Sequence, residues 1–238
     1  LIMMVREKHK TDDLLLLDIG VGRGGDICKW KRANIKTVIG LDIDLNSIME
    51  ARKRYKEANL IHTNYSFHLM RPDETINKVL YSIGKHTKKF HMISCQFALH
   101  YFCGSLNKLS GLLRDVRDKL LPGGFFIGTL MDGDSVLNLL SNKDVYENSA
   151  MRIRKHFENP KGIGDLIQFA LTGTLYFGEN FVSNEYVIMK DVLVNECKNH
   201  NLELIHWTFF SEFQKESKFD RDHQIASDLN VAFAFKKL

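Results

Sequence analysis

The chain has 238 residues, of which 44% are hydrophobic and 26% are charged. This length and composition fit one α/β domain with a sizeable core and exclude an intrinsically disordered chain. No apolar run is long enough to span a bilayer, and no secretory signal pattern opens the sequence. The four cysteines lack metal-ligand spacing, and the net charge of +4 permits an anionic partner without demonstrating one.

Short apolar runs alternate with amphipathic segments along the first part of the chain, which is typical of a parallel sheet covered by helices. Strands are predicted at Leu14–Ile19, Thr37–Asp42, Leu60–Asn64, Phe90–Cys95 and Phe125–Leu130. A short helix ends at Trp30, and longer helices are predicted at Leu45–Lys56 and at about Leu106–Leu120.

The second part of the chain is less regular. Residues 142–185 carry turn residues and short apolar pieces, so we expect a lid or insertion there. A helix is predicted at Val187–His200, and two strands, Leu202–Phe210 and Val231–Phe235, end the chain as a hairpin. The whole pattern predicts one α/β domain over residues 1–238, with a doubly wound, Rossmann-like, mostly parallel seven-stranded sheet and an antiparallel C-terminal edge strand.

A glycine-rich loop follows the first predicted strand and opens a helix, with the sequence Asp18-Ile-Gly20-Val-Gly22-Arg23-Gly24-Gly25-Asp26. Glycines let the backbone turn tightly and approach a ligand closely beside a helix N-terminus. Asp42 ends the second strand, where a carboxylate can bind ribose hydroxyls. Because the glycine spacing also satisfies the dinucleotide fingerprint, the loop alone leaves a nicotinamide- or flavin-dependent enzyme open.

Two carboxylates distinguish these alternatives. Asp18 ends the first strand and Asp26 follows the glycines, so both would repel a pyrophosphate. The same carboxylates would attract the ammonium and sulfonium charges of S-adenosylmethionine. Asp26 has the alternative role of a helix cap, and Asp42 that of a turn residue. The loop as a whole nevertheless indicates a methyltransferase.

The hexapeptide Gln96-Phe-Ala-Leu-His100-Tyr101 follows the fourth predicted strand, at the sheet edge where ligands bind. It resembles the Q-F-x-x-H-Y motif of mRNA cap guanine N-7 methyltransferases. The resemblance extends over nearly the whole chain through the glycine loop with Lys29-Trp30, the segment Leu121–Thr129, the tripeptide Asn184-Glu185-Tyr186 and the ending Phe233–Lys237. It implies a class I methyltransferase fold, S-adenosylmethionine as the cofactor, no metal, and guanine nitrogen-7 of a 5′ GpppN cap as the methyl acceptor.

The resemblance also implies roles for single residues. Gly20 would lie against the methionine part of the cofactor, and Asp42 would hold the ribose. Asn64 stands where the family usually has an aspartate that bonds the adenine amino group. The residues expected to bind the cofactor are Asp18, Gly20, Gly22, Asp26, Asp42, Asn64, Gln96 and Tyr101, and those expected to bind the cap are Arg23, Lys29, Arg54, Phe97, His100, Tyr101 and Glu185.

The chemistry of the cap residues fits these roles. A carboxylate only accepts hydrogen bonds, so Glu185 would complement the N-1 and N-2 donors of guanine and reject adenine. Phe97 or Tyr101 could stack on a purine, and Arg23 can fork onto phosphate oxygens.

Ordinary structural roles stay open for several of these side chains. His100 and Tyr101 could be core residues at a strand end. Arg54 belongs to Arg52-Lys53-Arg54, which could be a solvated helix face, and Lys29 could be an ordinary surface lysine.

Two positions depart from the family pattern. Asn230 stands where the family usually has a tyrosine, three residues before the closing F-x-F. The run Thr129-Leu-Met-Asp132-Gly133 replaces the usual Thr-x-Pro-Asn and is more similar to capping enzymes of large cytoplasmic DNA viruses, including poxviruses and African swine fever virus.

The family also carries an Asn-x-x-x-Lys segment before a stretch that matches Leu1-Ile2, and its lysine reaches the cofactor carboxylate. This sequence does not include it. We therefore expect the C-terminal domain of a longer capping enzyme, with triphosphatase and guanylyltransferase domains in the same chain. The expected partner is the capped 5′ end of mRNA, with no membrane. The expected location is intracellular, in the cytoplasm (virus factory or virion) for a viral enzyme and in the nucleus for a cellular one.

The implied reaction is a direct, in-line displacement. Guanine nitrogen-7 carries a free lone pair, so no acid, base or nucleophile is required, and His100, Tyr101 and Glu185 would act by orientation. Two alternatives stay open: a methyltransferase that acts on another RNA or a small molecule, and a non-catalytic methyltransferase-like module. The His100-Tyr101 pair with Glu185 favours the cap over the first, and the intact cofactor residues weigh against the second.

Overall fold

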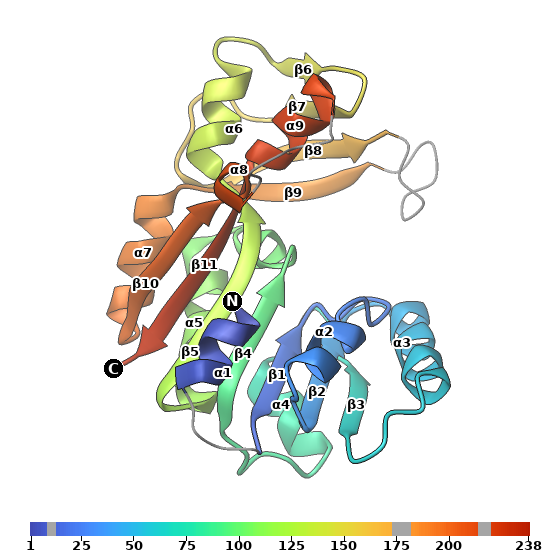
Figure 1. Cartoon of the computed structure of the whole chain (residues 1–238). Helices are drawn as coiled ribbons and strands as arrows, with labels where there is room; N and C mark the ends of the chain where they lie inside the picture. Colours follow the sequence, from blue (N-terminus) through green and yellow to red (C-terminus); the bar gives the residue numbers. More distant parts are fainter. Residues whose placement is uncertain (9–12, 173–181, 214–219) are drawn as a thin grey trace.

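The computed structural model describes residues 1–8, 13–172, 182–213 and 220–238. Its main sheet has seven strands in the order β10-β11-β5-β4-β1-β2-β3 (Figure 1). The strands are β1 (Leu15–Ile19), β2 (Thr37–Asp42), β3 (Asn64–Leu69), β4 (Phe90–Gln96), β5 (Leu120–Met131), β10 (Leu202–Phe209) and β11 (Asn230–Lys237). Strands β1 to β5 are parallel, whereas β11 is antiparallel to both of its neighbours. The mostly parallel α/β sheet predicted from the sequence is confirmed.

Helices cover both faces of this sheet, because its central strands are apolar on both sides. Leu16 of β1 packs in the core with helices α1, α2 and α3, whereas the next residue, Leu17, packs with α4, α5 and α7. Successive side chains of a strand point to opposite faces, so one strand serves two cores. The helices are α1 (Ile2–Lys8), α2 (Ile27–Arg32), α3 (Leu45–Glu57), α4 (Ile76–Ser82), α5 (Leu106–Lys119) and α7 (Lys190–Asn199).

A second, four-stranded antiparallel sheet lies beyond the carboxyl edge of the main sheet (Figure 1). Helices α6 and α9 pack against one of its faces, in a separate core that includes Leu140, Ile153 and Ile167. The 3-10 turn η1, which follows β4, contacts β9. The elements are β6 (Val145–Glu147), β7 (Met151–Lys155), β8 (Ile163–Leu171), β9 (Ser183–Ile188), α6 (Gly133–Leu140), α8 (Phe210–Phe213), α9 (Arg221–Asp228) and η1 (Leu99–Phe102).

The third predicted strand, Leu60–Asn64, is wrong, since β3 is Asn64–Leu69. The apolar pair at 60–61 suggested the strand, but Ile61 is 75% exposed. Tyr65 and Phe67 instead alternate with polar residues and pack their rings against Trp30. The prediction therefore placed Asn64 at the wrong end of its strand.

Other differences concern the second half of the chain. The irregular stretch 142–185 contains β6, β7, β8 and the first residues of β9 in its described part. The helix predicted from Val187 begins at Lys190, because Val187 and Ile188 still belong to β9. The sequence analysis did not predict helices α1, α4, α6, α8 and α9.

The C-terminal hairpin lies at the edge of the main sheet as predicted, but its two strands exchange the expected places. The antiparallel strand β11 lies one position in from the edge, and β10 is outermost. The run Val231–Phe235 is buried throughout, which suits a strand with neighbours on both sides, whereas most of β10 is partly exposed.

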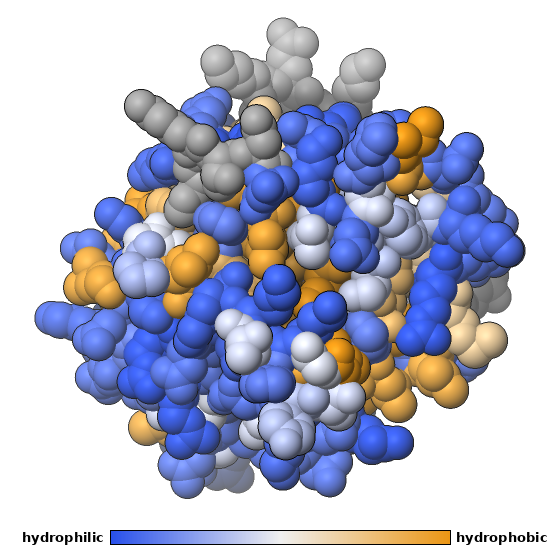
Figure 2. Space-filling view, turned by 90° about the horizontal axis from the view of Figure 1, so that it is seen from below, coloured by the Kyte–Doolittle hydropathy of each residue, from blue (hydrophilic) through white to orange (hydrophobic). Residues whose placement is uncertain are grey.

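Figure 2 shows the molecule from the end at which the parallel strands begin. Hydrophilic side chains cover most of this face, and hydrophobic side chains show between them. Within the described ranges, none of the helices combines the length and the apolar character that crossing a bilayer requires.

Candidate functional site

The candidate site lies at the carboxyl edge of the main sheet, where β1, β2 and β4 end side by side. Asp18, Asp42 and Gln96 lie in the last or next-to-last position of these strands. Because the strands are parallel and adjacent, residues far apart in the sequence meet at one edge. The second sheet lies opposite this edge (Figure 1).

The glycine loop packs closely onto β2 and β4. Gly20 has a φ of 74°, and a Cβ atom there would lie 2.4 Å from the Cβ of Ala98. The amide of Gly20 donates to the carbonyl of Leu41 at 2.8 Å, and the amide of Gly22 donates to Asp42 Oδ2 at 2.7 Å. The chain therefore requires glycine at position 20 for both conformation and space.

Asp18 is a buried carboxyl with one oxygen that has no partner among the described residues, Oδ1. Burial raises its pKa well above the usual range, the nearby Asp26 raises it further, and a hydrogen bond with Ser94 opposes both. A cation bound beside this carboxyl would lower its pKa and stabilise its ionised form. Its surroundings therefore fit the ammonium group of an amino-acid ligand.

Asp42 is a rigidly held carboxylate. Besides the bond from Gly22, its Oδ1 accepts from the amide of Asp44 at 2.9 Å. Asp44 in turn is the N-cap residue of α3, and its side chain accepts hydrogen bonds from the amides of Asn46 and Ser47. The end of β2 and the start of α3 thus form one hydrogen-bonded unit, with the exposed side chain of Ile43 between them. The sequence analysis assigned no role to Ile43, whose exposed apolar side chain directly follows Asp42.

Gln96 is fixed by two hydroxyl groups that sequence reasoning did not assign to the site. Its Nε2 donates to Ser94 Oγ at 3.0 Å, and its Oε1 accepts from Thr129 Oγ1 at 3.1 Å. The register of β4 and β5 places Thr129 opposite Gln96, and Ser94 shares its strand face. The next residue, Phe97, has a φ of 50° and a 50% exposed side chain, and its amide bonds the carbonyl of Thr129 at 3.0 Å.

His100 and Glu185 form a buried pair between the two sheets. Nδ1 of His100 on η1 lies 3.7 Å from Oε2 of Glu185 on β9, beyond hydrogen-bond distance. Burial lowers the pKa of His100 to about 4 and raises that of Glu185 to about 7, with a hydrogen bond from Ser183 opposing the rise. Near neutral pH the histidine is therefore uncharged, and neither ring nitrogen has a partner among the described residues. The ring of His100 therefore offers hydrogen-bonding capacity that the described residues leave unused.

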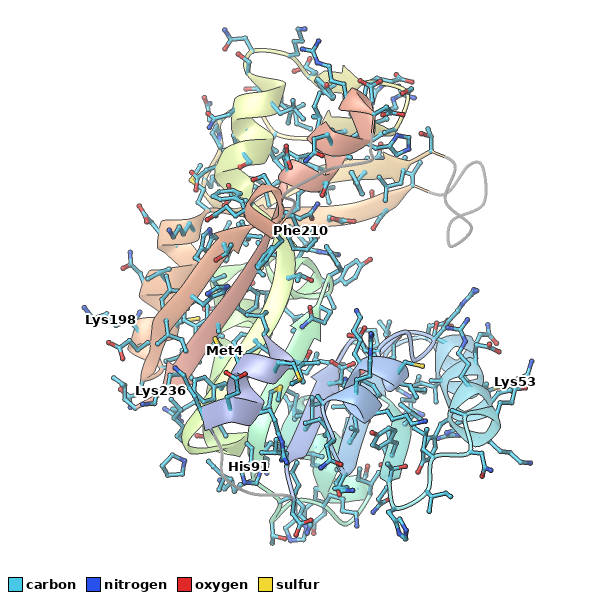
Figure 3. The ribbon with its side chains drawn as sticks, in the orientation of Figure 1. Met4, Lys53, His91, Lys198, Phe210 and Lys236 are labelled. Carbon is cyan, nitrogen blue, oxygen red and sulfur yellow. The ribbon has the colours of Figure 1, made fainter. Side chains whose placement is uncertain are left out.

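Tyr101 lies beside this pair with its ring 54% exposed. The ring centroids of Tyr101 and His100 are 4.1 Å apart, and the Tyr101 hydroxyl lies 3.3 Å from Ser183 Oγ on β9. Phe210 follows β10 at the junction of the two sheets (Figure 3), and its ring meets that of Phe97 edge-on at 6.0 Å. The site thus presents exposed aromatic faces beside a buried polar pair.

Phe210 is a site residue that sequence reasoning missed. The register continues from Phe209 opposite Val231, so Phe210 follows at the level of Asn230 on the adjacent strand. Asn230 itself donates from Nδ2 to the carbonyls of Ala226 and Ser227, at the end of α9. An aromatic ring is therefore present near the position where the family pattern has its tyrosine, but it comes from the first residue of α8, which follows the neighbouring strand β10.

The predicted basic residues are only partly brought to the site. Arg23 is exposed on the glycine loop, near Asp44. Lys29 pairs with Asp26 at 2.6 Å, so two predicted site residues bind each other. Asp26 is the N-cap residue of α2, but its side chain makes no capping hydrogen bond.

Arg54 lies in the last turn of α3, about 14 Å along the helix from its start. Its side chain pairs with Glu50 at 3.0 Å. The structure does not bring Arg54 to the His100 pair.

Asn64 also lies away from the site. It is the first residue of β3 and pairs with Thr37, the first residue of β2, whereas Asp42 ends β2. It lines a hollow of about 260 Å³ with Leu15 and Thr37, at the amino ends of their strands. The expected contact of Asn64 with an adenine ring is therefore wrong. The residue that lies beside Asp42 at the carboxyl end of β3 is Met70, whose amide donates to the carbonyl of Asp42 at 2.8 Å.

Across residues 1–8, 13–172, 182–213 and 220–238, no three His, Cys, Asp or Glu side chains are grouped in a way that could hold a metal ion. A reaction without a metal stays a prediction.

A family model described as "mRNA (guanine-N(7))-methyltransferase domain" matches residues 1–233. The chain is 30% identical over 223 residues to the mRNA cap guanine-N(7) methyltransferase of Schizosaccharomyces pombe, covering 88% of this chain and 59% of that protein. It is 26% identical over 224 residues to the Drosophila melanogaster protein of the same name, covering 89% and 51%. The chain thus spans between about half and three fifths of these relatives, and a viral origin stays a prediction.

Solved structures show the same fold. A S-adenosylmethionine-dependent methyltransferase from Clostridium acetobutylicum matches with a TM-score of 0.61 and 16% identity, over 94% of this chain and 83% of that one. A methyltransferase of the same kind from Methanosarcina mazei matches with a TM-score of 0.60 and 16% identity, over 98% and 96%. At such identity the likeness establishes the fold, which agrees with the predicted class I methyltransferase architecture.

Proposed function

Because the chain belongs to the mRNA (guanine-N(7))-methyltransferase domain family, we propose that it transfers a methyl group from S-adenosylmethionine to guanine nitrogen-7 of a 5′ GpppN cap. The observation that carries this proposal is the buried pair of His100 and Glu185, in which neither ring nitrogen of His100 has a hydrogen-bond partner among the described residues. The pair combines a carboxyl that suits guanine donors with an uncharged ring.

The residues at the carboxyl edge fit the proposed cofactor. Asp18 would accept from its amino group, Gly20 would let the backbone approach its methionine part, and Asp42 would hold the ribose hydroxyls. Gln96 would line the same site, held by Ser94 and Thr129. When bound, S-adenosylmethionine supplies the methyl group to be transferred. Tyr101, Gly22 and Asp26 remain proposed members of this set, and Ile43 would pack against the adenine in place of the contact assigned to Asn64.

Glu185 would recognise guanine in its ionised form. The carboxyl has a pKa of about 7 without ligand, but only its ionised form accepts from both N-1 and N-2. Donors of the guanine edge favour the ionised form and lower this pKa, so affinity for the cap should increase as pH rises through 7. The ionised carboxylate would also favour the positive charge that the purine acquires on methylation.

Catalysis would consist of orientation. Phe97 and Tyr101 present exposed rings on which a purine can stack, and Arg23 would bind the cap phosphates. With the purine held between these groups, its nitrogen-7 lone pair would point in line with the transferred methyl group. No residue of the site has to remove or donate a proton. Lys29 and Arg54 would contribute only if they exchanged their present partners, Asp26 and Glu50.

The second sheet would act as the lid of this site, since Glu185 and Ser183 come from its strand β9.

We further propose that the chain is the C-terminal domain of a longer capping enzyme with triphosphatase and guanylyltransferase domains, acting on the 5′ end of mRNA. The viral and the cellular locations expected from the sequence stay predictions.

The test is methyl transfer from labelled S-adenosylmethionine to GpppA-capped RNA and to ApppA-ended RNA. Label is expected in the G-capped RNA only and is expected to be lost in Glu185→Ala. The control variant Glu203→Ala removes an exposed carboxylate on β10 and should retain the activity. Equal transfer to both RNAs, or full activity of Glu185→Ala, would contradict the assignment of guanine to Glu185.

A further inference from the structure

A hollow of about 290 Å³ opens on one face of the second sheet. The register of β7 and β8 places two exposed arginines opposite Ala170 and Gln168, so their side chains share this face. Met151 and Ile153 alternate with the arginines and point into the core on the other face. The residues that line the hollow are Arg152, Arg154, Gln168, Ala170 and Val182.

The hollow lies back to back with the proposed guanine site. Along β9, Ser183 and Glu185 face Tyr101 and His100. Successive side chains of a strand alternate, so the exposed Asn184 points to the face of the hollow. Strand β8 separates β7 from β9, which places the arginines about 10 Å from β9 across the sheet. A chain that leaves the guanine site past the edge strand β9 would meet the hollow on the opposite face of the same sheet.

Among the described residues, little holds the charges of the hollow in place. Arg152 meets Glu147 at 3.5 Å, but both side chains are about half exposed, and such surface pairs exchange readily with solvent or a ligand. Arg154 has no carboxylate within 4.0 Å in the part of the chain that the structure describes. A guanidinium group can donate two hydrogen bonds to the oxygens of one phosphate. The side-chain amides of Gln168 and Asn184 can donate hydrogen bonds to sugars and bases and accept hydrogen bonds from them.

We propose that this hollow binds the RNA chain immediately downstream of the cap, with Arg152 and Arg154 on its phosphates. The proposal rests on the proposed function, because it assigns a second contact with the same substrate. The hollow would add affinity for RNA without reading its sequence, since phosphate contacts position a nucleic acid rather than specify its bases.

The test compares the double variant Arg152→Gln/Arg154→Gln with the wild-type chain. Its affinity for an uncapped, fluorescently labelled RNA of about ten nucleotides, measured by anisotropy, should fall roughly tenfold, and the dependence of log affinity on log salt should become shallower by about 1.4. In methyl transfer, its KM should rise for a capped RNA of the same length and stay unchanged for the GpppA dinucleotide.

The matched control is Lys108→Gln/Arg114→Gln, which removes two exposed charges from α5 and should leave RNA affinity unchanged. Unchanged RNA affinity in the hollow variant, or an equal loss in the control, would overturn the proposal and leave the hollow to a protein partner. The anisotropy measurement needs no methyl transfer, so an absent methyltransferase activity would count against the proposed function without affecting this result.

Discussion

His100 and Glu185 should make opposite contributions to the pH dependence of stability. Burial raises the pKa of Glu185 from 4.5 to about 7 and lowers that of His100 from 6.5 to about 4. Each pKa therefore differs by about 2.5 between the folded and unfolded chain. At 1.36 kcal/mol for each pH unit, either side chain changes the free energy of unfolding by roughly 3 kcal/mol across its range.

The two signs follow from which state holds the proton. Between pH 4.5 and 7 the folded chain keeps a proton on Glu185 that the unfolded chain has lost, so this contribution to stability falls as pH rises. Between pH 4 and 6.5 the unfolded chain holds a proton on His100 that the folded chain excludes, so this contribution falls as pH falls. The two slopes nearly cancel in the wild-type chain between pH 4.5 and 6.5.

Single variants should reveal the hidden slopes. Urea unfolding, followed by tryptophan fluorescence from pH 4 to 8, gives the free energy of unfolding of the wild-type chain, Glu185→Gln and His100→Gln. The difference between the wild-type chain and Glu185→Gln should fall by roughly 3 kcal/mol as pH rises, and the difference from His100→Gln should rise by a similar amount. Glu203→Gln, an exposed control, should give a flat difference. A flat difference for Glu185→Gln as well would refute the argument that burial governs this pair.

Three further results are expected. Gly20→Ala should abolish binding of S-adenosylmethionine in calorimetry, since its Cβ would lie 2.4 Å from Ala98, whereas Gly25→Ala, with open space and an ordinary φ, should bind normally. Asp42→Asn should weaken cofactor binding at least tenfold by removing a charged acceptor, roughly 1.5 kcal/mol, whereas Asn64→Ala should leave it unchanged; a loss in Asn64→Ala would contradict the position of β3. Phe210→Ala should raise the KM for capped RNA severalfold, because the ring of Phe97 loses its contact with Phe210, and cofactor affinity should stay unchanged. Phe210→Tyr should restore the KM. A parallel loss of affinity for RNA and for the cofactor would indicate a general structural defect.

Local sequence patterns predict well which residues lie at the carboxyl edge of the main sheet, and the binding of a cofactor there stays a prediction. Asp18 and Asp42 end apolar runs of strand length, and Gln96 follows another, so the geometry of a parallel sheet brings them together. The error at Asn64 has an equally local cause. An apolar pair in an exposed turn resembles the start of a strand, and a shift of a few residues moves a side chain from one edge of the sheet to the other.

The acceptor half is less accessible to such reasoning. His100 and Glu185 meet across 85 positions of sequence, and only the family resemblance linked them. The strands of the second sheet are short and separated by turns, so their alternation, visible in Met151–Lys155, is too brief to predict a sheet. The contact of Phe210 with Phe97 depends on the register of a hairpin, which composition does not determine.

The residues of the proposed site come from two separate sheets. The groups proposed for the methyl donor belong to the main sheet, at or near the ends of β1, β2 and β4. Glu185 and Ser183 belong to the inserted sheet, joined to the first across the site by side chains such as those of His100 and Tyr101. Under the proposed assignment, substitutions in the second sheet would therefore alter recognition of the methyl acceptor while leaving the groups proposed for the donor unchanged.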